Sequence, residues 1–398
     1  MTTRIDVGTP APAAHLGSRP DHRGSWIPTG PMIATRIMEL RKRRGLMIAL
    51  VAVNIGIPTV FLTIRLLTHA LAPASYGPAG GYDIYTSLVA RIMFVFGFIV
   101  AATLGCTAGS VDLSEGMFRH LVVTGRSRLA LYLARIPAGL AIVVPIVAIG
   151  FTVVCAVCVF AAPTQLNYNG VHVPANLSRP TLESWAADHP TEVICDFPYN
   201  LGPSSGASLG NVVQAVNCNK GPNGGTRIFK QPPGVQPPPQ PTEAQMRNTA
   251  RTIARISYVD YSRQFLYPSN SLMIESGLWL ELEAAIGFIV GLGLASLIGQ
   301  RTVAVVLMIV LELILTPIVS MNVIPHLINA QRAVVGLATT HLEPGDLPLP
   351  FGGGGGPGGG RGMGVLVPES TTVAVCVIVA WLVVWTALGA WRMMTRDA

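Results

Sequence analysis

The fold of this chain is decided by long apolar stretches, the longest of which is LYLARIPAGLAIVVPIVAIGFTVVCAVCVFAA, residues 131–162. Its only charged residue is Arg135. A helix that crosses a bilayer needs about 20 consecutive, mostly apolar residues. Five further stretches of this kind lie at 45–67, 85–106, 275–299, 303–324 and 370–391. The sequence therefore predicts an all-α polytopic membrane protein with six transmembrane helices.

The composition supports the same fold class. Of 398 residues, 50% are hydrophobic and 12% are charged, and the mean hydropathy is +0.50. A soluble protein carries about 25% charged residues. The net charge of +7 comes almost wholly from arginine, and no basic stripe with interleaved aromatics appears. We therefore interpret the charge as a topology signal and predict no nucleic-acid partner.

The short loops predict the orientation. Arginine and lysine gather next to one set of helix ends, whereas the opposite short loop, 69–83, has neither residue. Short cytoplasmic loops carry the excess of basic residues. Both termini and the segment 107–130 are therefore predicted to be cytoplasmic, in a bacterial cell membrane. The basic residues that decide this are Arg36, Arg41, Lys42, Arg43, Arg44, Arg119, Arg126, Arg128, Arg301, Arg392 and Arg396.

Four regions follow from this pattern. Residues 1–30 are predicted to be a disordered cytoplasmic tail, and 31–44 an interfacial amphipathic helix; the alternative for 31–44 is a plain basic flank. The region 31–162 also holds the first three spans, and 163–274 is a large external insertion. In that insertion Thr242 and Gln245 are spaced as a helix capping box. Residues 275–398 hold spans four to six with a second external loop, 325–369.

No residue pattern predicts an enzyme. A phosphate-binding P-loop needs lysine after glycine, and none of the three lysines, Lys42, Lys220 and Lys230, follows one. The eight histidines form no H-E-x-x-H motif. We therefore expect no catalytic residue, no metal ligand and no cofactor on this chain.

A few ionisable residues fall inside the predicted spans. Glu312 lies in the middle of the fifth span, five residues before Pro317. Such a group is costly in lipid and usually faces a bundle interior, so it is a candidate contact for a proton, an ion or a substrate. The alternative is a structural contact to a neighbouring helix. Arg91, Glu281 and Glu283 either pair across the bundle or extend toward the headgroups.

Two cysteines lie outside the spans. Cys195 and Cys218 are both in the external insertion, 23 residues apart. An oxidising compartment favours a disulfide between them, and the alternative is two free thiols. Cys155 and Cys158 match C-x-x-C, but they lie in an apolar run, where a thiol behaves as a small hydrophobe.

The segment 112–128 is charged but also carries apolar residues at helical spacing, so it predicts a docking surface for a soluble partner. Around it the chain reads Gly105-x-x-x-Gly109-x-x-x-Leu-x-x-Gly116-x-x-Arg119-x-Leu-x-x-Thr124-Gly-Arg-Ser-Arg128-x-x-Leu-Tyr-Leu-Ala-Arg135. This pattern resembles the loop between the second and third spans of ABC-2 type transporter permeases, particularly those of actinobacteria. The resemblance covers most of 31–162 and 275–392.

The resemblance implies a function. In such permeases an elbow helix precedes the first span, a re-entrant element follows the fifth, and two permease halves work with two ATP-binding-cassette subunits. The loop after the second span docks on the ATPase subunit. Here the docking residues would be Glu115, Met117, Phe118, Arg119 and Leu121. The chain departs from the family in its long connection between the third and fourth spans.

The expected function is therefore an export permease, with an unidentified substrate, that uses ATP hydrolysed by a separate subunit. A second permease half and the lipid bilayer are the other expected partners. Two alternatives remain open at this point. One is a membrane-anchored scaffold or sensor that acts through its external lobe. The other is an ion-coupled carrier that uses Glu312.

Overall fold

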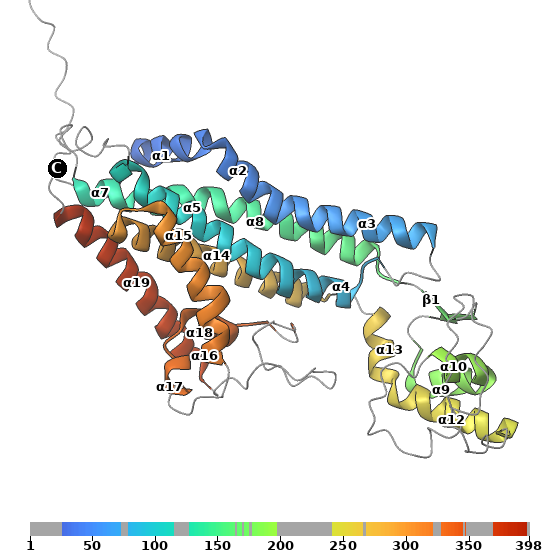
Figure 1. Cartoon of the computed structure of the whole chain (residues 1–398). Helices are drawn as coiled ribbons and strands as arrows, with labels where there is room; N and C mark the ends of the chain where they lie inside the picture. The colour runs from blue at the N-terminus through green and yellow to red at the C-terminus, as the bar shows by residue number, and fades with distance from the viewer. Residues whose placement is uncertain are drawn as a thin grey trace, which may run out of the picture.

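The structure is a computed structural model, and it describes residues 26–72, 79–114, 127–163, 165–168, 171–174, 177–196, 241–265, 268–320, 328–344, 347 and 369–395. The predicted tail 1–30 lies almost wholly outside this part of the chain. The described residues are mostly helical (Figure 1). The fold class predicted from the sequence is confirmed at this level.

Five helices of the described chain are long and apolar enough to cross a membrane. They are Arg44–Leu71, Tyr82–Ser110, Arg128–Phe160, Asn270–Ile298 and Thr371–Thr395. Each corresponds to one of the six apolar stretches predicted from the sequence. The chain is therefore a multi-pass membrane protein by the length and composition of its helices.

The remaining stretch, predicted at 303–324, is also helical as far as the structure describes it. The helix α15, Arg301–Val310, continues into a π-helical turn, η4, Leu311–Leu315, and then into α16, Thr316–Ser320. Residues 321–327 lie outside the described chain. The helix therefore begins two residues before the predicted start.

Two of the long helices are built from shorter elements joined by π-helical turns. The first consists of α2, Arg44–Val51, the turn η1, Ala52–Gly56, and α3, Ile57–Leu71. Pro58 lies directly after η1, inside this continuous helix, where its missing N–H removes one backbone hydrogen bond. The second consists of α4, Tyr82–Ser87, the turn η2, Leu88–Met93, and α5, Phe94–Ser114.

The other long helices have few interruptions. The third consists of α7, Arg128–Leu133, and α8, Arg135–Phe160, and the fourth is α14, Asn270–Ile298. The last is α19, Thr371–Thr395. Ser127 and Ser269 each accept a hydrogen bond from a first-turn amide, so both α7 and α14 begin with a side-chain cap.

The helix α14 is the centre of the bundle and packs against α5, α8, α15 and α19. Small residues let the backbones approach closely. A Cβ atom added to Gly291 would lie 2.5 Å from the carbonyl oxygen of Ala102 on α5. On the other side, a Cβ added to Gly105 would lie 2.0 Å from the carbonyl oxygen of Phe288. The contact between α5 and α14 therefore requires glycine on both helices.

A separate helix, α1, Gly30–Lys42, precedes the first long helix, and it packs against α8. The chain departs from helical geometry at Arg43, where φ is −80° and ψ is 70°. Arg36 and Glu39 form an ion pair of 2.6 Å between successive turns of α1. The structure therefore contains a helix at the position where the sequence predicted an interfacial amphipathic helix, residues 31–44.

Two short helices lie between α16 and α19: α17, Ile328–Gln331, and α18, Val335–Thr340. All six residues of α18 are buried. Figure 1 shows α16, α17 and α18 together beside the first turns of α19. This segment belongs to the loop 325–369, and its described part is packed into the bundle.

The insertion 163–274 forms, in its described part, a lobe with its own core. It contains the strands β1, Gln165–Tyr168, and β2, Val171–Pro174, paired antiparallel, and the helices α9, Arg179–Asp188, α10, Pro190–Asp196, α12, Glu243–Ile256, and α13, Tyr258–Phe265. The buried core includes Leu182, Ile194 and Ile253. The capping box predicted at Thr242 and Gln245 is present.

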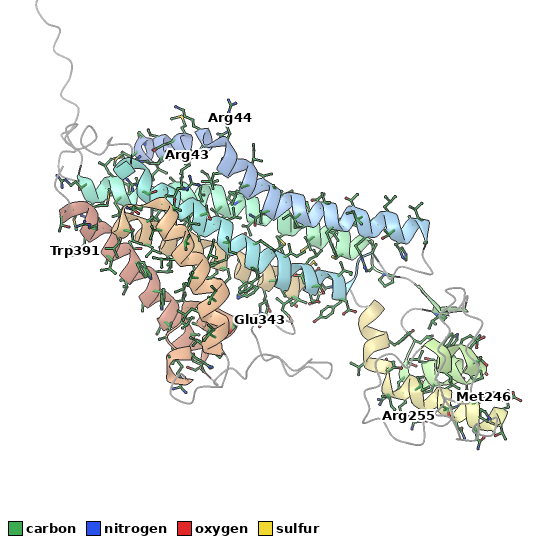
Figure 2. All side chains as sticks on the ribbon, viewed as in Figure 1. Arg43, Arg44, Met246, Arg255, Glu343 and Trp391 are labelled. Carbon is green, nitrogen blue, oxygen red and sulfur yellow. The ribbon has the colours of Figure 1, made fainter. Side chains whose placement is uncertain are left out.

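The two strands are a departure from the all-α prediction. Tyr261 fixes the end of the hairpin, because its hydroxyl group donates to the carbonyl oxygen of Pro174 and accepts from the amide of Leu177. Arg255 and Glu183 join α12 to α9 through two hydrogen bonds of 2.9 Å. Figure 2 labels Met246 and Arg255 on this lobe.

The lobe and the basic helix ends lie at opposite ends of the long helices. In Figure 1 the lobe is at the lower right, whereas α1, α7 and the end of α19 are at the left. Figure 2 shows Arg43, Arg44 and Trp391 at that left-hand side. Arg128 of α7 donates a hydrogen bond of 3.2 Å to the carbonyl oxygen of Met394. The basic clusters of α1, α7 and α19 thus share one end of the bundle.

Candidate functional site

Two of the ionisable residues predicted inside the spans meet in the bundle. Glu283 lies 13 positions after the start of α14, and Glu312 lies 11 positions after the start of α15. At 1.5 Å per residue these are depths of about 20 Å and about 17 Å. Because α14 and α15 follow each other along the chain and pack together, the two carboxyl groups reach the middle of the bundle from opposite ends.

Both carboxyl groups are almost completely enclosed. The exposed fractions are 3% for Glu283 and 2% for Glu312. The two groups are close enough to interact electrostatically, and the carboxyl of Glu283 lies near the side chain of Thr339, whose hydroxyl donates to the carbonyl oxygen of Gly336.

The helix α18 covers this pair. A Cβ atom added to Gly336 would lie 3.0 Å from Oε2 and 3.4 Å from Oε1 of Glu312. Glycine at this position therefore leaves space for the carboxyl group. Thr339, three residues later on the same face of α18, reaches Glu283. The pair is thus enclosed by α14, η4 and α18.

Hydrogen bonds from three sides hold the segment 328–344 in place. The indole Nε1 of Trp279 on α14 donates to the carbonyl oxygen of Thr339 at 3.1 Å. The indole Nε1 of Trp381 on α19 donates to the carbonyl oxygen of Ala333 at 2.8 Å. Gln331 donates to the carbonyl oxygen of Val319 at 2.8 Å. The carbonyl oxygen of Thr339 also accepts from the amide of Leu342, so the indole of Trp279 is its second donor.

Each carboxyl group of the pair keeps one oxygen that makes no hydrogen bond to the described part of the protein. These atoms are Oε1 of Glu283 and Oε2 of Glu312, and both are shielded from solvent. A buried oxygen without a donor costs about 1–3 kcal/mol. The two groups therefore place two unsatisfied acceptor atoms in the interior of the bundle.

More titratable groups follow α18 along the chain. His341 Nε2 lies 3.6 Å from a carboxylate oxygen of Glu369, whose side chain is only 3% exposed. Two residues further, burial raises the pKa of the Glu343 carboxyl to about 8. Figure 2 labels Glu343 at the side of the bundle where α16 and α18 lie.

The other predicted site residues are not brought into this pair. Glu281 is half-buried on α14. Arg91 belongs to η2, but its side chain is not among those the structure describes, so its predicted pairing stays a prediction. Among the described residues, no group of three or more histidine, cysteine or acidic side chains could hold a metal ion.

The remaining sequence predictions fall largely on parts of the chain that the structure does not describe. The predicted docking residues Glu115, Met117, Phe118, Arg119 and Leu121 lie outside the described residues. Cys218 also lies outside them, and of Cys195 only the backbone is described, within α10. Cys155 and Cys158 are free thiols on α8.

Sequence reasoning singled out both glutamates but did not predict that they meet, and it missed Gly336 and Thr339. A signal for these two residues does exist. From Ala333 to Thr340 the supposed external loop carries no charge and is mostly apolar. Such a run inside a loop is typical of a buried segment.

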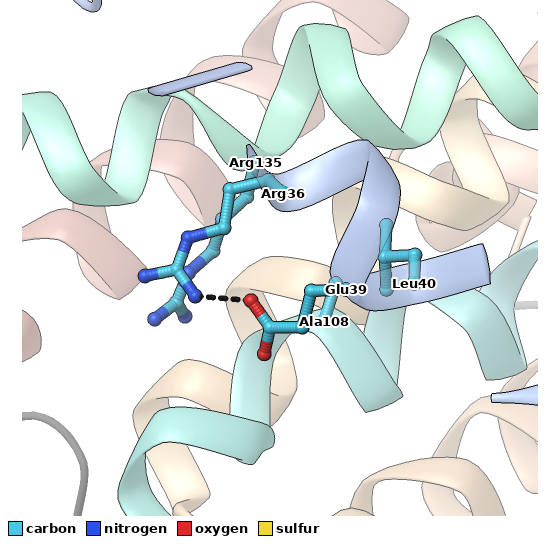
Figure 3. A pocket seen from close by; sticks show the side chains of 5 residues that line it. All are labelled: Arg36, Glu39, Leu40, Ala108 and Arg135. Carbon is cyan, nitrogen blue, oxygen red and sulfur yellow. Dashed lines mark hydrogen bonds and ion pairs between the residues drawn. The ribbon is translucent and has the colours of Figure 1, made fainter. Parts of the chain in front are cut away.

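A second polar cluster lies at the basic end of the bundle (Figure 3). Arg36 and Glu39 of α1, Ala108 of α5 and Arg135 of α8 line a small cavity together with Leu40. Arg135 is 2% exposed and donates a hydrogen bond of 3.2 Å to the carbonyl oxygen of Gly109. This cluster joins α1 to the helices on either side of the segment 115–126.

Comparisons with known proteins add no relative. No protein-family model, no curated protein and no solved structure matches this chain.

Proposed function

We propose that this chain is the membrane-spanning permease subunit of an ATP-binding-cassette exporter. In this proposal α15, η4 and α16 belong to a sixth span, α1 is the interfacial elbow helix, and 328–344 is the re-entrant element. Both termini face the cytoplasm of a bacterium and the lobe faces outside. A second permease half, identical or related, and two ATPase subunits complete the transporter.

One observation carries this proposal: the ends of α5 and α7 that flank 115–126 share the basic end of the bundle with α1, opposite the lobe (Figure 1). A docking site for a cytoplasmic ATPase must lie at the end that carries the excess of arginine. The order of the elements further supports the proposal. A helix precedes the first long helix, and a buried short helix lies between the last two.

The packing offers a route for the proposed coupling. The helix α5 contacts α14 along its length, and α7 contacts α19. The hydrogen bond from Arg128 to Met394 strengthens the second contact. A displacement of the segment 112–128 by the closing ATPase dimer would therefore reach α14 through α5, and α19 through α7. The two halves would then rock or separate to open a path.

The experiment is co-purification from native membranes. We expect an ATP-binding-cassette subunit to come with the chain at equal stoichiometry, and Arg119→Glu to remove it by reversing a docking charge. The matched control is Arg247→Glu, which changes an exposed arginine on the lobe. A preparation without any ATPase, or equal retention in both variants, would count against the proposal.

The lobe gives the scaffold or sensor alternative a specific observation of its own. It has a separate hydrophobic core and an ion pair between α9 and α12. In that alternative the long helices only anchor the lobe, so substitutions in 112–128 would be tolerated. Intolerance confined to the lobe would therefore favour the scaffold over the permease.

A further inference from the structure

The lobe carries arginines along one face of its helix α12. Arg247, Arg251 and Arg255 follow one another at four-residue intervals, and all three side chains are exposed. Four residues of α-helix rise by about 6 Å and return to nearly the same face. The three guanidinium groups therefore form a row along α12.

A fourth arginine, Arg179 of the neighbouring helix α9, joins this row at the end near α13. Its guanidinium group donates a hydrogen bond of 3.4 Å to the carbonyl oxygen of Arg255 and lies 5.8 Å from the centre of the Tyr258 ring. Arg255 in turn makes two hydrogen bonds of 2.9 Å to Glu183 of α9. These contacts hold two of the guanidinium groups in defined positions. We call the four residues the arginine band, and they are Arg179, Arg247, Arg251 and Arg255.

The arginine band carries more positive than negative charge. Glu183 pairs with Arg255, and Glu243 pairs with Arg247. Within the described part of the chain, neither of the other two arginines forms an ion pair. Like charges four residues apart destabilise a helix. The stability of α12 therefore does not explain why the arginines gather there.

The surface around the arginine band is polar. Of the large apolar side chains on α9 and α12, only Ile256 is exposed. Stable protein–protein contacts have an apolar centre. Surfaces that bind nucleic-acid bases offer free aromatic rings, but here Arg179 lies over Tyr258, and Trp185 is stacked with His189. The described surface therefore suits a hydrophilic ligand without bases.

The geometry points to a linear polyanion. We propose that the arginine band binds a polymer with phosphodiester groups along its chain, of the kind that lies at the outer cell surface. A guanidinium group holds a phosphate group through two parallel N–H···O hydrogen bonds. Because the row repeats about every 6 Å, it can engage successive groups of one chain, which a single small anion cannot do.

The place of the arginine band suits a ligand beyond the membrane. The lobe reaches the bundle through α13, which packs against α4, whereas α12 packs against α9, α10 and α13. In Figure 1 α12 lies at the end of the molecule opposite α1 and α7. The inference rests on the proposed function only for the side of the membrane that the lobe faces. Binding of the polymer requires neither transport nor an ATPase.

The test is a binding titration with the full-length protein in nanodiscs of phosphatidylcholine, which carries no net charge. The probe is a fluorescently labelled poly(glycerol phosphate) chain, and binding is followed by fluorescence anisotropy. We expect the affinity to fall about tenfold between 50 and 200 mM salt, because bound phosphate groups release their counterions. Arg251→Gln should weaken binding several-fold and lower the slope of log affinity against log salt by about one.

Two further variants make the test specific. Arg332→Gln removes an exposed arginine outside the lobe and should bind like the wild type. Arg251→Lys keeps the charge but loses the planar fork, so it should weaken binding less than Arg251→Gln and keep the salt slope.

Three results would overturn the proposal. The wild type does not bind the probe at 50 mM salt, or Arg251→Gln and Arg332→Gln bind it equally, or polyglutamate of similar length binds as tightly. In the last case an acidic protein is the partner. Since the titration uses the chain alone, a failure to co-purify an ATPase leaves its result unchanged, and the two proposals can fail separately.

Discussion

The contact between α5 and α14 allows a quantitative prediction for Gly105→Ala. The new Cβ atom would lie 2.0 Å from the carbonyl oxygen of Phe288, whereas ordinary van der Waals contact begins at 3.4 Å. The atom it meets is backbone, so no side-chain rotation can relieve the clash. The two helices must separate locally by about 1.4 Å, and α14 is also packed against three other helices.

Overpacking of this kind costs about 1–3 kcal/mol. Alanine gains up to about 1 kcal/mol over glycine in helix propensity, which offsets part of that cost. We therefore expect Gly105→Ala to lower the free energy of unfolding by about 1–2 kcal/mol. Thermal unfolding of the purified protein in detergent, followed by loss of the monodisperse chromatographic peak, measures the change as a fall in the midpoint.

The control is Gly45→Ala. Gly45 is also helical, but a Cβ atom there would meet nothing within 4 Å. This variant should unfold at the wild-type temperature or slightly above it. If both variants shift the midpoint equally, the close approach of α5 and α14 is not what requires glycine, and the reasoning fails.

Three further predictions concern other parts of the fold. Below about pH 4.5 the Glu343 carboxyl is protonated in both the folded and the unfolded protein. Above that pH this carboxyl ionises first in the unfolded chain, because burial raises its pKa in the folded protein to about 8. The free energy of unfolding should therefore fall as the pH rises from about 4.5 to about 8. Glu343→Gln should make this fall smaller when thermal midpoints are measured over a series of pH values. Trp279→Phe removes the indole donor that joins α14 to the carbonyl oxygen of Thr339, which keeps only the Leu342 amide as donor, so hydrogen exchange in α18 should accelerate by an amount equivalent to about 0.5–1.5 kcal/mol, unlike Trp391→Phe at an exposed position. Tyr261→Phe removes the hydroxyl that joins the hairpin to α13 and should destabilise the lobe by about 1 kcal/mol, as measured by local hydrogen exchange, with Tyr258→Phe as the control.

Each of these predictions has an outcome that contradicts it. A pH series that is unchanged by Glu343→Gln would mean that the carboxyl group is not buried in the folded state. Equal exchange rates in Trp279→Phe and wild type would mean that the indole does not hold α18. If Tyr258→Phe destabilises the lobe as much as Tyr261→Phe, the hydroxyl of Tyr261 does not hold the hairpin in the way described.

Features that depend on local sequence were predictable. The long helices follow from apolar runs of about 20 residues, and the start of α12 follows from the spacing of Thr242 and Gln245. Each of these features can be recognised from one continuous segment of the sequence.

Features that depend on two distant segments were not predictable in the same way. The sequence shows that Glu283 and Glu312 are each unusual in an apolar helix, but helical periodicity does not say which neighbour a residue meets. The contact arises because α18, only six residues long, packs over both. A helix of that length has no clear sequence signal of its own, since its burial depends on the helices around it.

The hairpin of the lobe shows the same limit. β1 and β2 have four residues each, and the end of β2 is held by a hydroxyl group from Tyr261, more than 80 positions away. A strand of four residues lies near the lower limit of strand length. The departure from an all-helical fold therefore came from a tertiary contact that local pattern does not reveal.

The three described π-helical turns have a consequence for the length of the chain. The turns η1, η2 and η4 contain Asn54, Arg91 and Glu312, which are polar residues inside long apolar helices. A π-helical turn holds one residue more than an α-helical turn, so deleting that residue would rotate the two halves of the helix by about 100° against each other. A deletion in η4 would turn Glu312 away from Glu283 or turn the lipid-facing residues inward. Homologues that keep the carboxyl pair must therefore keep this extra residue in the middle of the helix, where single-residue insertions are otherwise least expected.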